Sequence, residues 1–318
     1  MRALVAGGAG FVGSHLVELL VERGDDVVVV DNLLTGSPAN LEHLPRHRVT
    51  LLREDVETTP DGDYERVYHL ASPASPEAYG RHQVATLSAN AEGTRRLLDI
   101  AERCGARFLL ASTSEIYGDP LEHPQRETYW GNVDPIGPRS MYDEGKRYAE
   151  ALTVAYVRER DADARIVRIF NAYGPRMQLG DGRMPSAFIA AALRGRPLLV
   201  HGDGSQTRSL CYVKDTARGL VAAMERGRAG EAYNIGRADE YTVLEFALRV
   251  ILAAESDSRV HFVPGRPQEI QRRRPDGAKA ERDLGWIPLT SLEAGLSQTL
   301  AWYRAAIGEA VLSTRPGT

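Results

Sequence analysis

A tyrosine and a lysine four residues apart, Tyr142 and Lys146, are the side chains whose spacing points most directly to chemistry. If the segment is helical, positions i and i+4 project from one face, so the lysine ammonium would lie beside the phenol. A nearby positive charge favours the phenolate, and we therefore expect Lys146 to lower the pKa of Tyr142 from about 10 toward working pH. Such a phenol can act as a general base toward an alcohol. The same spacing also suits an exposed helix with an aromatic anchor, so the surrounding motifs have to decide.

The N-terminus carries a glycine-rich segment typical of a phosphate-binding loop. A short apolar run ends in Ala6, and Gly7, Gly10 and Gly13 follow with the spacing G-x-x-G-x-x-G before a helical pattern. Gly7 permits a tight turn, Gly10 lets the backbone approach a pyrophosphate, and Gly13 allows close helix packing. The free N–H groups at the helix start would face the anion. These features predict a dinucleotide site.

A carboxylate at the end of the second strand-like run indicates which dinucleotide is bound. The run Val27–Val30 ends in Asp31, at the expected distance for an acidic side chain that accepts hydrogen bonds from the adenosine ribose hydroxyls. Its charge would repel a 2′-phosphate. We therefore predict NAD, and not NADP, as the cofactor.

Composition is that of a soluble enzyme. The chain has 318 residues and a formal net charge of −4, and its pI is near 6.1, so neither nucleic acid nor a membrane is an expected partner. No apolar run approaches the length of a membrane span, and the cofactor strand begins at residue 2, so we expect no secretion signal. Cys104 and Cys211 lack a metal-ligand spacing. We predict a cytoplasmic protein without a metal site.

Apolar runs and helical patterns alternate along the first half of the chain. The strand-like runs are 49–53, 66–70, 107–111 and 165–170, and the helical patterns are 84–103 and 142–160. This alternation predicts an α/β fold with a Rossmann-type doubly wound parallel sheet. Shorter elements follow after about Asn171. We therefore predict an NAD-binding domain over residues 1–172 and a smaller C-terminal α/β substrate lobe over residues 173–318, with some segments returning to the first domain.

Longer motifs narrow the function. They are H-L-A-S-P-A-S-P at 69–76, L-A-S-T-S-E-I-Y-G at 110–118, Y-W-G-N-V-D-P-I-G-P-R at 129–139 and R-I-F-N-A-Y-G-P-R-M at 168–177, with shorter matches at 181–183, 204–208 and 272–276. Over nearly its whole length the chain resembles the extended short-chain dehydrogenases/reductases that act on nucleotide sugars. It is most similar to the UDP-glucuronic acid decarboxylases, also called UDP-xylose synthases.

The resemblance implies a reaction in three steps. Tyr142 would take the proton of the sugar 4-hydroxyl while NAD accepts the hydride, with Lys146 holding the ribose and Thr113 hydrogen-bonding the phenol or the substrate oxygen. The 4-ketone makes the substrate a β-keto acid, which loses carbon dioxide and leaves an enolate that the site stabilises. Once the enolate is protonated to the UDP-4-keto-pentose, return of the hydride gives UDP-xylose, and incomplete return leaves the UDP-4-keto-pentose. Because NAD is regenerated, it would stay tightly bound.

The resemblance also implies residue roles. The expected catalytic residues are Thr113, Ser114, Glu115, Tyr142, Lys146 and Arg273. Glu115 beside the substrate carboxylate would be a like-charge pair that favours loss of the carboxylate, and Arg273 would orient the group and offset its charge. The register among the three arginines at 272–274 is open by one position.

Two further sets of residues follow from the resemblance. The expected NAD-binding residues are Gly7, Gly10, Phe11, Val12, Gly13, Asp31, Asn32, Asp55, Val56, Leu70, Ala71, Ser72, Asn90, Tyr142, Lys146 and Arg176. The expected UDP-sugar-binding residues are Asn171, Arg183, Arg208, Tyr212 and Arg273. A homodimer is expected as well, and the helical patterns 84–103 and 142–160 are long enough to form its interface, although core packing would explain their apolar stripes equally well.

Three other functions stay open. A UDP-glucuronate 4-epimerase would use the same oxidation but retain the carboxylate, and a nucleotide-hexose 4,6-dehydratase would expel water. Dehydratases usually carry Asp-Glu where this chain has Ser114-Glu115, which counts against that function. A non-catalytic NAD-binding regulator could share the fold. Such proteins often lose the tyrosine or the lysine, and this chain keeps both.

Overall fold

The structure is a computed structural model that describes residues 1–265 and 270–313. Its main element is a seven-stranded parallel sheet with the order β11-β6-β5-β4-β1-β2-β3. The strands are β1 (Arg2–Ala6), β2 (Asp26–Val30), β3 (Val49–Leu52), β4 (Arg66–His69), β5 (Arg107–Thr113), β6 (Ala164–Ile169) and β11 (Ala232–Ile235). The predicted doubly wound α/β sheet is therefore confirmed.

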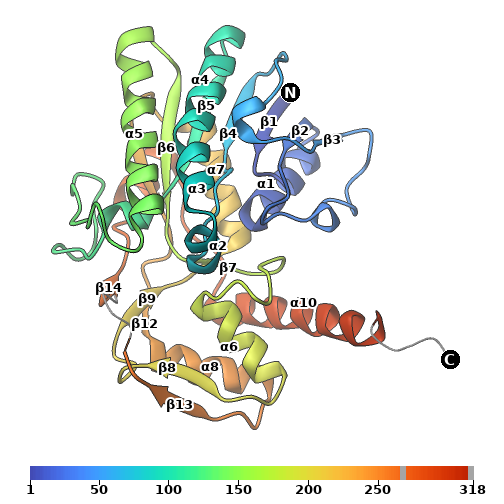
Figure 1. Cartoon of the computed structure of the whole chain (residues 1–318), viewed down its shortest axis with the longest axis vertical. Coiled ribbons are helices and arrows are strands. Elements are labelled where there is room, and N and C mark those ends of the chain that lie inside the picture. The colour runs from blue at the N-terminus through green and yellow to red at the C-terminus, as the bar shows by residue number, and fades with distance from the viewer. Residues whose placement is uncertain (266–269, 314–318) are drawn as a thin grey trace.

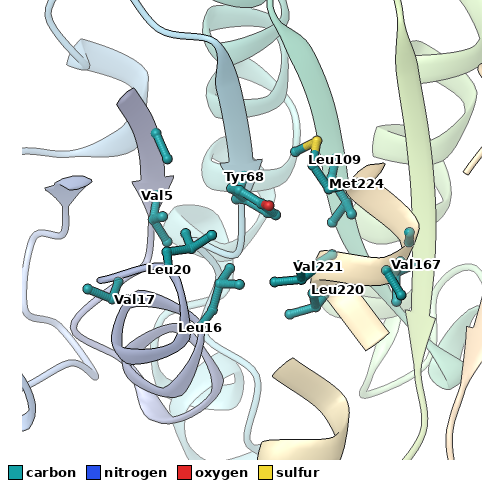
Figure 2. Close-up of a cluster of buried hydrophobic side chains, with 14 of the residues drawn as sticks. Val5, Leu16, Val17, Leu20, Tyr68, Leu109, Val167, Leu220, Val221 and Met224 are labelled. Atoms are coloured by element: carbon teal, nitrogen blue, oxygen red, sulfur yellow. The ribbon is translucent and has the colours of Figure 1, made fainter. Parts of the chain in front are cut away.

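Helices cover both faces of this sheet (Figure 1). One face carries α1 (Phe11–Glu22) and α7 (Val213–Arg226), and the other carries α3 (Gln83–Asn90), α4 (Glu92–Cys104) and α5 (Ser140–Arg160). Successive residues of a strand point to opposite faces, so Leu4 and Val5 belong to two separate buried clusters. Figure 2 shows the cluster on the α1 and α7 side, where Val5 and Tyr68 meet Leu16 and Leu220. Both faces are buried because the sheet is parallel.

A second lobe lies below the sheet in Figure 1. It contains α6 (Met184–Leu193), α8 (Val243–Ala254), α10 (Leu292–Ser313), the parallel pair β8 (Leu198–His201) and β13 (Val260–Val263), and the three-stranded sheet of β12 (Glu240–Thr242), β9 (Thr207–Ser209) and β14 (Arg272–Arg273). The remaining elements are α2 (Pro76–Arg81), β7 (Ala172–Tyr173), β10 (Cys211–Tyr212) and α9 (Ala278–Leu284). A separate buried cluster that includes Phe188, Phe246 and Leu296 forms the core of the second lobe.

The chain crosses between the two parts more than once. Strand β11 pairs with β6 in the large sheet, and α7 packs on α1, although both lie after residue 172. Both therefore pack with elements from the first half of the chain. The division at residue 172 stays a prediction.

The helical pattern expected at 84–103 is divided in the structure. Helix α3 ends at Asn90 and α4 begins at Glu92, and Ala91 between them has φ −97° and ψ −78°, well away from the helical ψ of about −42°. The expectation of one long helix was therefore wrong. After the break Gly93 lies against Val56, where an added Cβ would come within 2.5 Å of Val56 Cγ1.

Among the described residues, no helix combines the length and apolar character needed to cross a membrane.

Candidate active site

A cleft of about 530 Å³ lies between the carboxyl ends of the sheet strands and the second lobe. Its lining includes Gly7 after β1, Asp31 after β2, Leu70 after β4, Thr113 at the end of β5 and Asn171 after β6. Residues 176–178 and 180–185, Arg208 and Arg273 line its other side. Doubly wound sheets bind ligands outside the carboxyl ends of their strands, and the volume suits a sizeable ligand.

The glycine loop fits a dinucleotide pyrophosphate. Gly7 has φ +79°, and an added Cβ there would lie 2.6 Å from Ala71 N. A Cβ on Gly13 would lie 2.1 Å from Gly7 O, so neither position accepts a side chain. Gly10 is the N-cap of α1 and offers no capping side chain. The first N–H groups of α1 are therefore left without intrahelical partners and can bind an anion.

Asp31 is held in place by backbone donors. Its carboxylate accepts hydrogen bonds from Ala9 N at 3.0 Å and from Leu33 N at 2.9 Å. Burial raises the pKa of this carboxyl, while the two backbone bonds oppose the shift. Because each carboxylate oxygen can accept a further hydrogen bond, Asp31 can still accept one from a ribose hydroxyl at the cleft wall. The free N–H groups of the glycine loop and the Asp31 carboxylate thus fit the NAD expected from the sequence.

Tyr142 lies in the first turn of α5 and is buried against another tyrosine. Its ring stacks on that of Tyr79 in α2, with the centroids 5.1 Å apart and the planes 11° from parallel. Burial raises the pKa of Tyr142, and the neighbouring Thr113 hydroxyl opposes that shift. The phenol therefore sits between a hydroxyl partner and an aromatic face at the cleft.

Lys146 does not act on the phenol as the sequence suggested. Its Nζ donates to Ala111 O at 2.8 Å, and the pKa of Tyr142 is raised, so the expected lowering by Lys146 is wrong for this structure. The reason is that both groups are buried, which penalises the phenolate and the ammonium alike. Burial also lowers the pKa of Lys146 to about 7, against the opposing charge of Glu150.

Replacing Lys146 with methionine is expected to stabilise the nucleotide-free protein in a pH-dependent way. Folding lowers the pKa of Lys146 to about 7, so between about pH 7 and 10 the unfolded chain binds more protons. The free energy of unfolding of the wild type therefore rises with pH in this window. Lys146→Met should gain about 2–4 kcal/mol at pH 7, and the gain should shrink toward pH 10.

Calorimetric unfolding at several pH values checks this expectation. Lys214→Met is the matched control, because it removes the same charge from an exposed position on α7. A difference between Lys146→Met and the wild type that stays constant from pH 7 to pH 10 would contradict the assignment.

Glu115 is the centre of a charged cluster. It lies in the 3-10 turn Ser114–Tyr117 after β5, and its carboxylate accepts hydrogen bonds from both Arg139 and Arg273. Burial would raise the pKa of Glu115, but the charges of Arg273 and then Arg139 outweigh it and hold the pKa below its usual range. Glu115 is therefore ionised at neutral pH.

The three arginines at 272–274 differ in burial and in their contacts. The side chain of Arg273 is 4% exposed and points to Glu115, whereas Arg272 is exposed. Buried Gln125 fixes this register, because its Oε1 accepts from Arg274 N at 2.8 Å and its own N–H donates to Arg274 O at 2.9 Å. The expected proximity of Arg273 to Glu115 is thus present.

Most of the residues expected from the sequence lie at the cleft. Those that line it are Gly7, Gly10, Phe11, Val12, Gly13, Asp31, Asn32, Asp55, Val56, Leu70, Ala71, Ser72, Thr113, Ser114, Glu115, Tyr142, Lys146, Asn171, Arg176, Arg183, Arg208 and Arg273. In the second lobe Arg183 is held by Asp181, with Nε to Oδ1 at 2.5 Å and Nη2 to Oδ2 at 2.8 Å. Arg176 donates to Glu18 at 2.7 Å.

Two expected residues lie outside the cleft. Tyr212 packs against Tyr173 in the core of the second lobe, and its hydroxyl donates to Gln298 at 2.9 Å, so it is placed to support the fold instead of touching substrate. Asn90 is fully buried and donates to Ser72 Oγ at 2.9 Å. It positions a cleft residue without reaching the cleft itself.

Among the lining residues that were not predicted, Arg139 and Tyr79 matter most for the chemistry. Arg139 and Tyr79 both line the cleft, and both contact predicted residues. A signal for Arg139 was present, since it directly precedes the helix that carries Tyr142 and its carbonyl oxygen accepts from Tyr142 N at 3.0 Å. Tyr79 lies on a six-residue helix whose place beside α5 no local pattern indicated.

The doubly wound sheet, the glycine loop and the buried Tyr142–Lys146 pair are the features of NAD-dependent dehydrogenase-type proteins. The chain belongs to the NAD dependent epimerase/dehydratase family, whose description matches residues 3–236. UDP-glucuronic acid decarboxylase 1 of Arabidopsis thaliana is 50% identical over 308 residues, which are 96% of this chain and 71% of the relative. UDP-glucuronic acid decarboxylase 1 of Danio rerio is 48% identical over 303 residues, 95% of this chain and 72% of the relative.

A solved structure agrees with this placement. The dTDP-glucose 4,6-dehydratase DesIV of Streptomyces venezuelae, with NAD and TYD bound, superposes with a TM-score of 0.86 at 31% identity. The match covers 97% of this chain and 98% of that one. Both the fold and the NAD cofactor expected from the sequence are therefore confirmed.

Proposed function

We propose that this protein decarboxylates UDP-glucuronic acid, with tightly bound NAD, to UDP-xylose, to the UDP-4-keto-pentose or to both, with release of carbon dioxide. The proposal rests mainly on one observation: two pairs of functional side chains line the same cleft. The Tyr142 phenol with Thr113 can take the proton of an alcohol whose hydride passes to NAD, and the ionised Glu115 with Arg273 can act on a carboxylate. The curated decarboxylases that match 96% of the chain support it.

The residues divide the work as follows. NAD, when bound, accepts a hydride from carbon 4 and later returns it. Tyr142 takes the proton of the 4-hydroxyl, with Thr113 orienting the phenol, and Lys146, one helical turn further on at the same cleft, holds the ribose.

The carbon–carbon bond breaks next to the ketone, and its electron pair moves onto the ketone oxygen as an enolate. Ionised Glu115 repels the bound carboxylate, and Arg273 orients it. Asn171, Arg183 and Arg208 line the second-lobe side of the cleft and supply donors for the diphosphate.

Incubation of the purified protein with UDP-glucuronic acid and trace NAD tests the proposal. Carbon dioxide release with pentose or 4-keto-pentose in the NMR spectrum supports it. UDP-galacturonic acid without gas release would replace it with the 4-epimerase, and absence of turnover would call for dTDP- and GDP-hexoses as the next substrates. The ratio of the two pentoses reports how completely the hydride returns.

We also propose a homodimer formed through the α3 and α5 face. The two helices pack against each other, and Val84 (77% exposed), Leu87 (43%) and Tyr148 (52%) leave large apolar side chains on them in contact with solvent. A second copy would cover this surface. Sedimentation equilibrium should give twice the 34.9 kDa chain mass, and Val84→Glu should give monomer. A wild-type monomer at micromolar concentration would refute the dimer.

A cytoplasmic location is the matching proposal for the compartment. It is supported by Cys104 and Cys211, which are both free thiols. Fractionation of cells that express the tagged chain tests it.

A further inference from the structure

The cluster around Glu115 carries more positive than negative charge. Two guanidinium groups, Arg139 and Arg273, face the single Glu115 carboxylate. Asp143 is the other acid close to this cluster, and its pKa is raised by burial and then by Glu115. It therefore supplies less than a full second negative charge. The pocket wall keeps a surplus of positive charge that an anion can neutralise.

Arg139 is the cation of this cluster that remains accessible. Its side chain is 32% exposed, against 4% for Arg273, and it lines the cleft. The buried Nε atoms of Arg139 and Arg273 find no hydrogen-bond partner among the described residues. A guanidinium has five donors, so both arginines keep capacity for another acceptor while they hold Glu115.

The backbone places Arg139 beside Tyr142. Arg139 is the residue before α5, and its carbonyl oxygen accepts from Tyr142 N and from Asp143 N, both at 3.0 Å. Its guanidinium also approaches the hydroxyl of Tyr79, whose pKa is raised to about 12 by burial and lowered in part by Arg139. Since Tyr79 stacks on Tyr142, Arg139 lies next to the phenol that acts on the sugar.

We propose that Arg139 is the specificity-determining residue that binds the carboxylate of the acidic sugar and discriminates against neutral sugars. Both arginines donate to Glu115, but Arg273 is buried in the wall, whereas Arg139 presents the surplus charge toward the cleft. An arginine–carboxylate contact is charge-assisted and can be bidentate. A hydroxymethyl group in the same place would leave that charge without a partner, which disfavours neutral sugars.

The test compares two ligands that differ only in this group. UDP-glucuronic acid and UDP-glucose share every atom except the carboxylate and hydroxymethyl at carbon 5. Calorimetric binding to the NAD-loaded protein in a Tyr142→Phe background measures both affinities without turnover. Adding Arg139→Gln should weaken the affinity for UDP-glucuronic acid about tenfold or more and change the affinity for UDP-glucose less than about twofold. Arg139→Lys should recover part of the loss, because it keeps the charge and loses the fork.

Kinetics give a second readout with the Tyr142 side chain intact. Arg139→Gln should raise KM for UDP-glucuronic acid far more than it lowers kcat, since the contact forms before the carbon–carbon bond breaks. Arg158→Gln, which removes an exposed arginine from the last turn of the same helix, is the matched control and should leave both constants unchanged.

Two results would overturn the assignment. Equal weakening of both ligands would show that Arg139 only supports the wall, and unchanged binding of both would show that it does not meet the sugar. The inference rests on the proposed decarboxylation, but the two fail separately. A wild type that releases no carbon dioxide refutes the function, whereas the affinity ratio still decides the role of Arg139.

Discussion

Replacing Tyr142 with phenylalanine is expected to reduce carbon dioxide release by about 10²–10⁴-fold. The change removes one oxygen, and with it the group that takes the 4-hydroxyl proton. No decarboxylation can precede that step, because the carboxylate leaves only after carbon 4 becomes a ketone. The ring itself should stay in place, since its stacking on Tyr79 does not involve the hydroxyl. Binding of UDP-glucuronic acid and thermal stability should therefore change little.

Steady-state kinetics with a radiometric or NMR assay measure this loss. Tyr148→Phe is the matched control, because it makes the same change on the same helix at a side chain that does not line the cleft. A Tyr142→Phe variant that keeps more than a tenth of the wild-type rate would refute Tyr142 as the base.

Local motifs made the cofactor half of the site predictable. The loop from Gly7 to Gly13 and the carboxylate of Asp31 act through backbone geometry that a few neighbouring residues determine. Their place at the sheet edge then follows from the parallel order of the strands. For this reason the sequence alone was sufficient to predict NAD and the strands that present it.

Burial and contacts between residues far apart in the sequence limited what could be predicted about the site. The Tyr142–Lys146 spacing correctly predicted one helix face, yet the expected direction of the Tyr142 pKa was wrong, because burial of the phenol raises this pKa. Tyr212 was expected at the substrate, but its hydroxyl meets Gln298, which lies 86 residues later. Neither burial nor such a distant contact leaves a local pattern in the sequence.

The charged cluster shows the same limit in a different form. Resemblance placed Glu115 and Arg273 together, which the structure also does. Arg139 was not among the expected site residues, although it directly precedes the helix that carries Tyr142. Its contact with Glu115, which Arg273 of β14 shares, joins segments far apart in the sequence and leaves no local pattern.

The second large effect is expected for Glu115→Gln, which keeps the shape of the side chain and removes its charge. Two guanidinium groups would then face an uncharged amide. The free energy of unfolding should fall by about 3 kcal/mol, since breaking one partner of a buried ion cluster leaves charge uncompensated. Chemical denaturation measures this change. Glu115→Gln/Arg273→Gln should recover much of the loss, because it removes one of the two unpaired cations.

Glu115→Gln should lower kcat while it strengthens substrate binding. A neutral residue 115 no longer repels the substrate carboxylate and frees Arg139 and Arg273 to hold it, so KM for UDP-glucuronic acid should fall. The same change removes the repulsion that favours loss of the carboxylate, so kcat should fall by about 10²-fold or more. A lower KM together with a lower kcat is the pattern of lost ground-state destabilisation. If KM rises while kcat holds, Glu115 is a binding group, and the driving force for decarboxylation comes from the ketone alone.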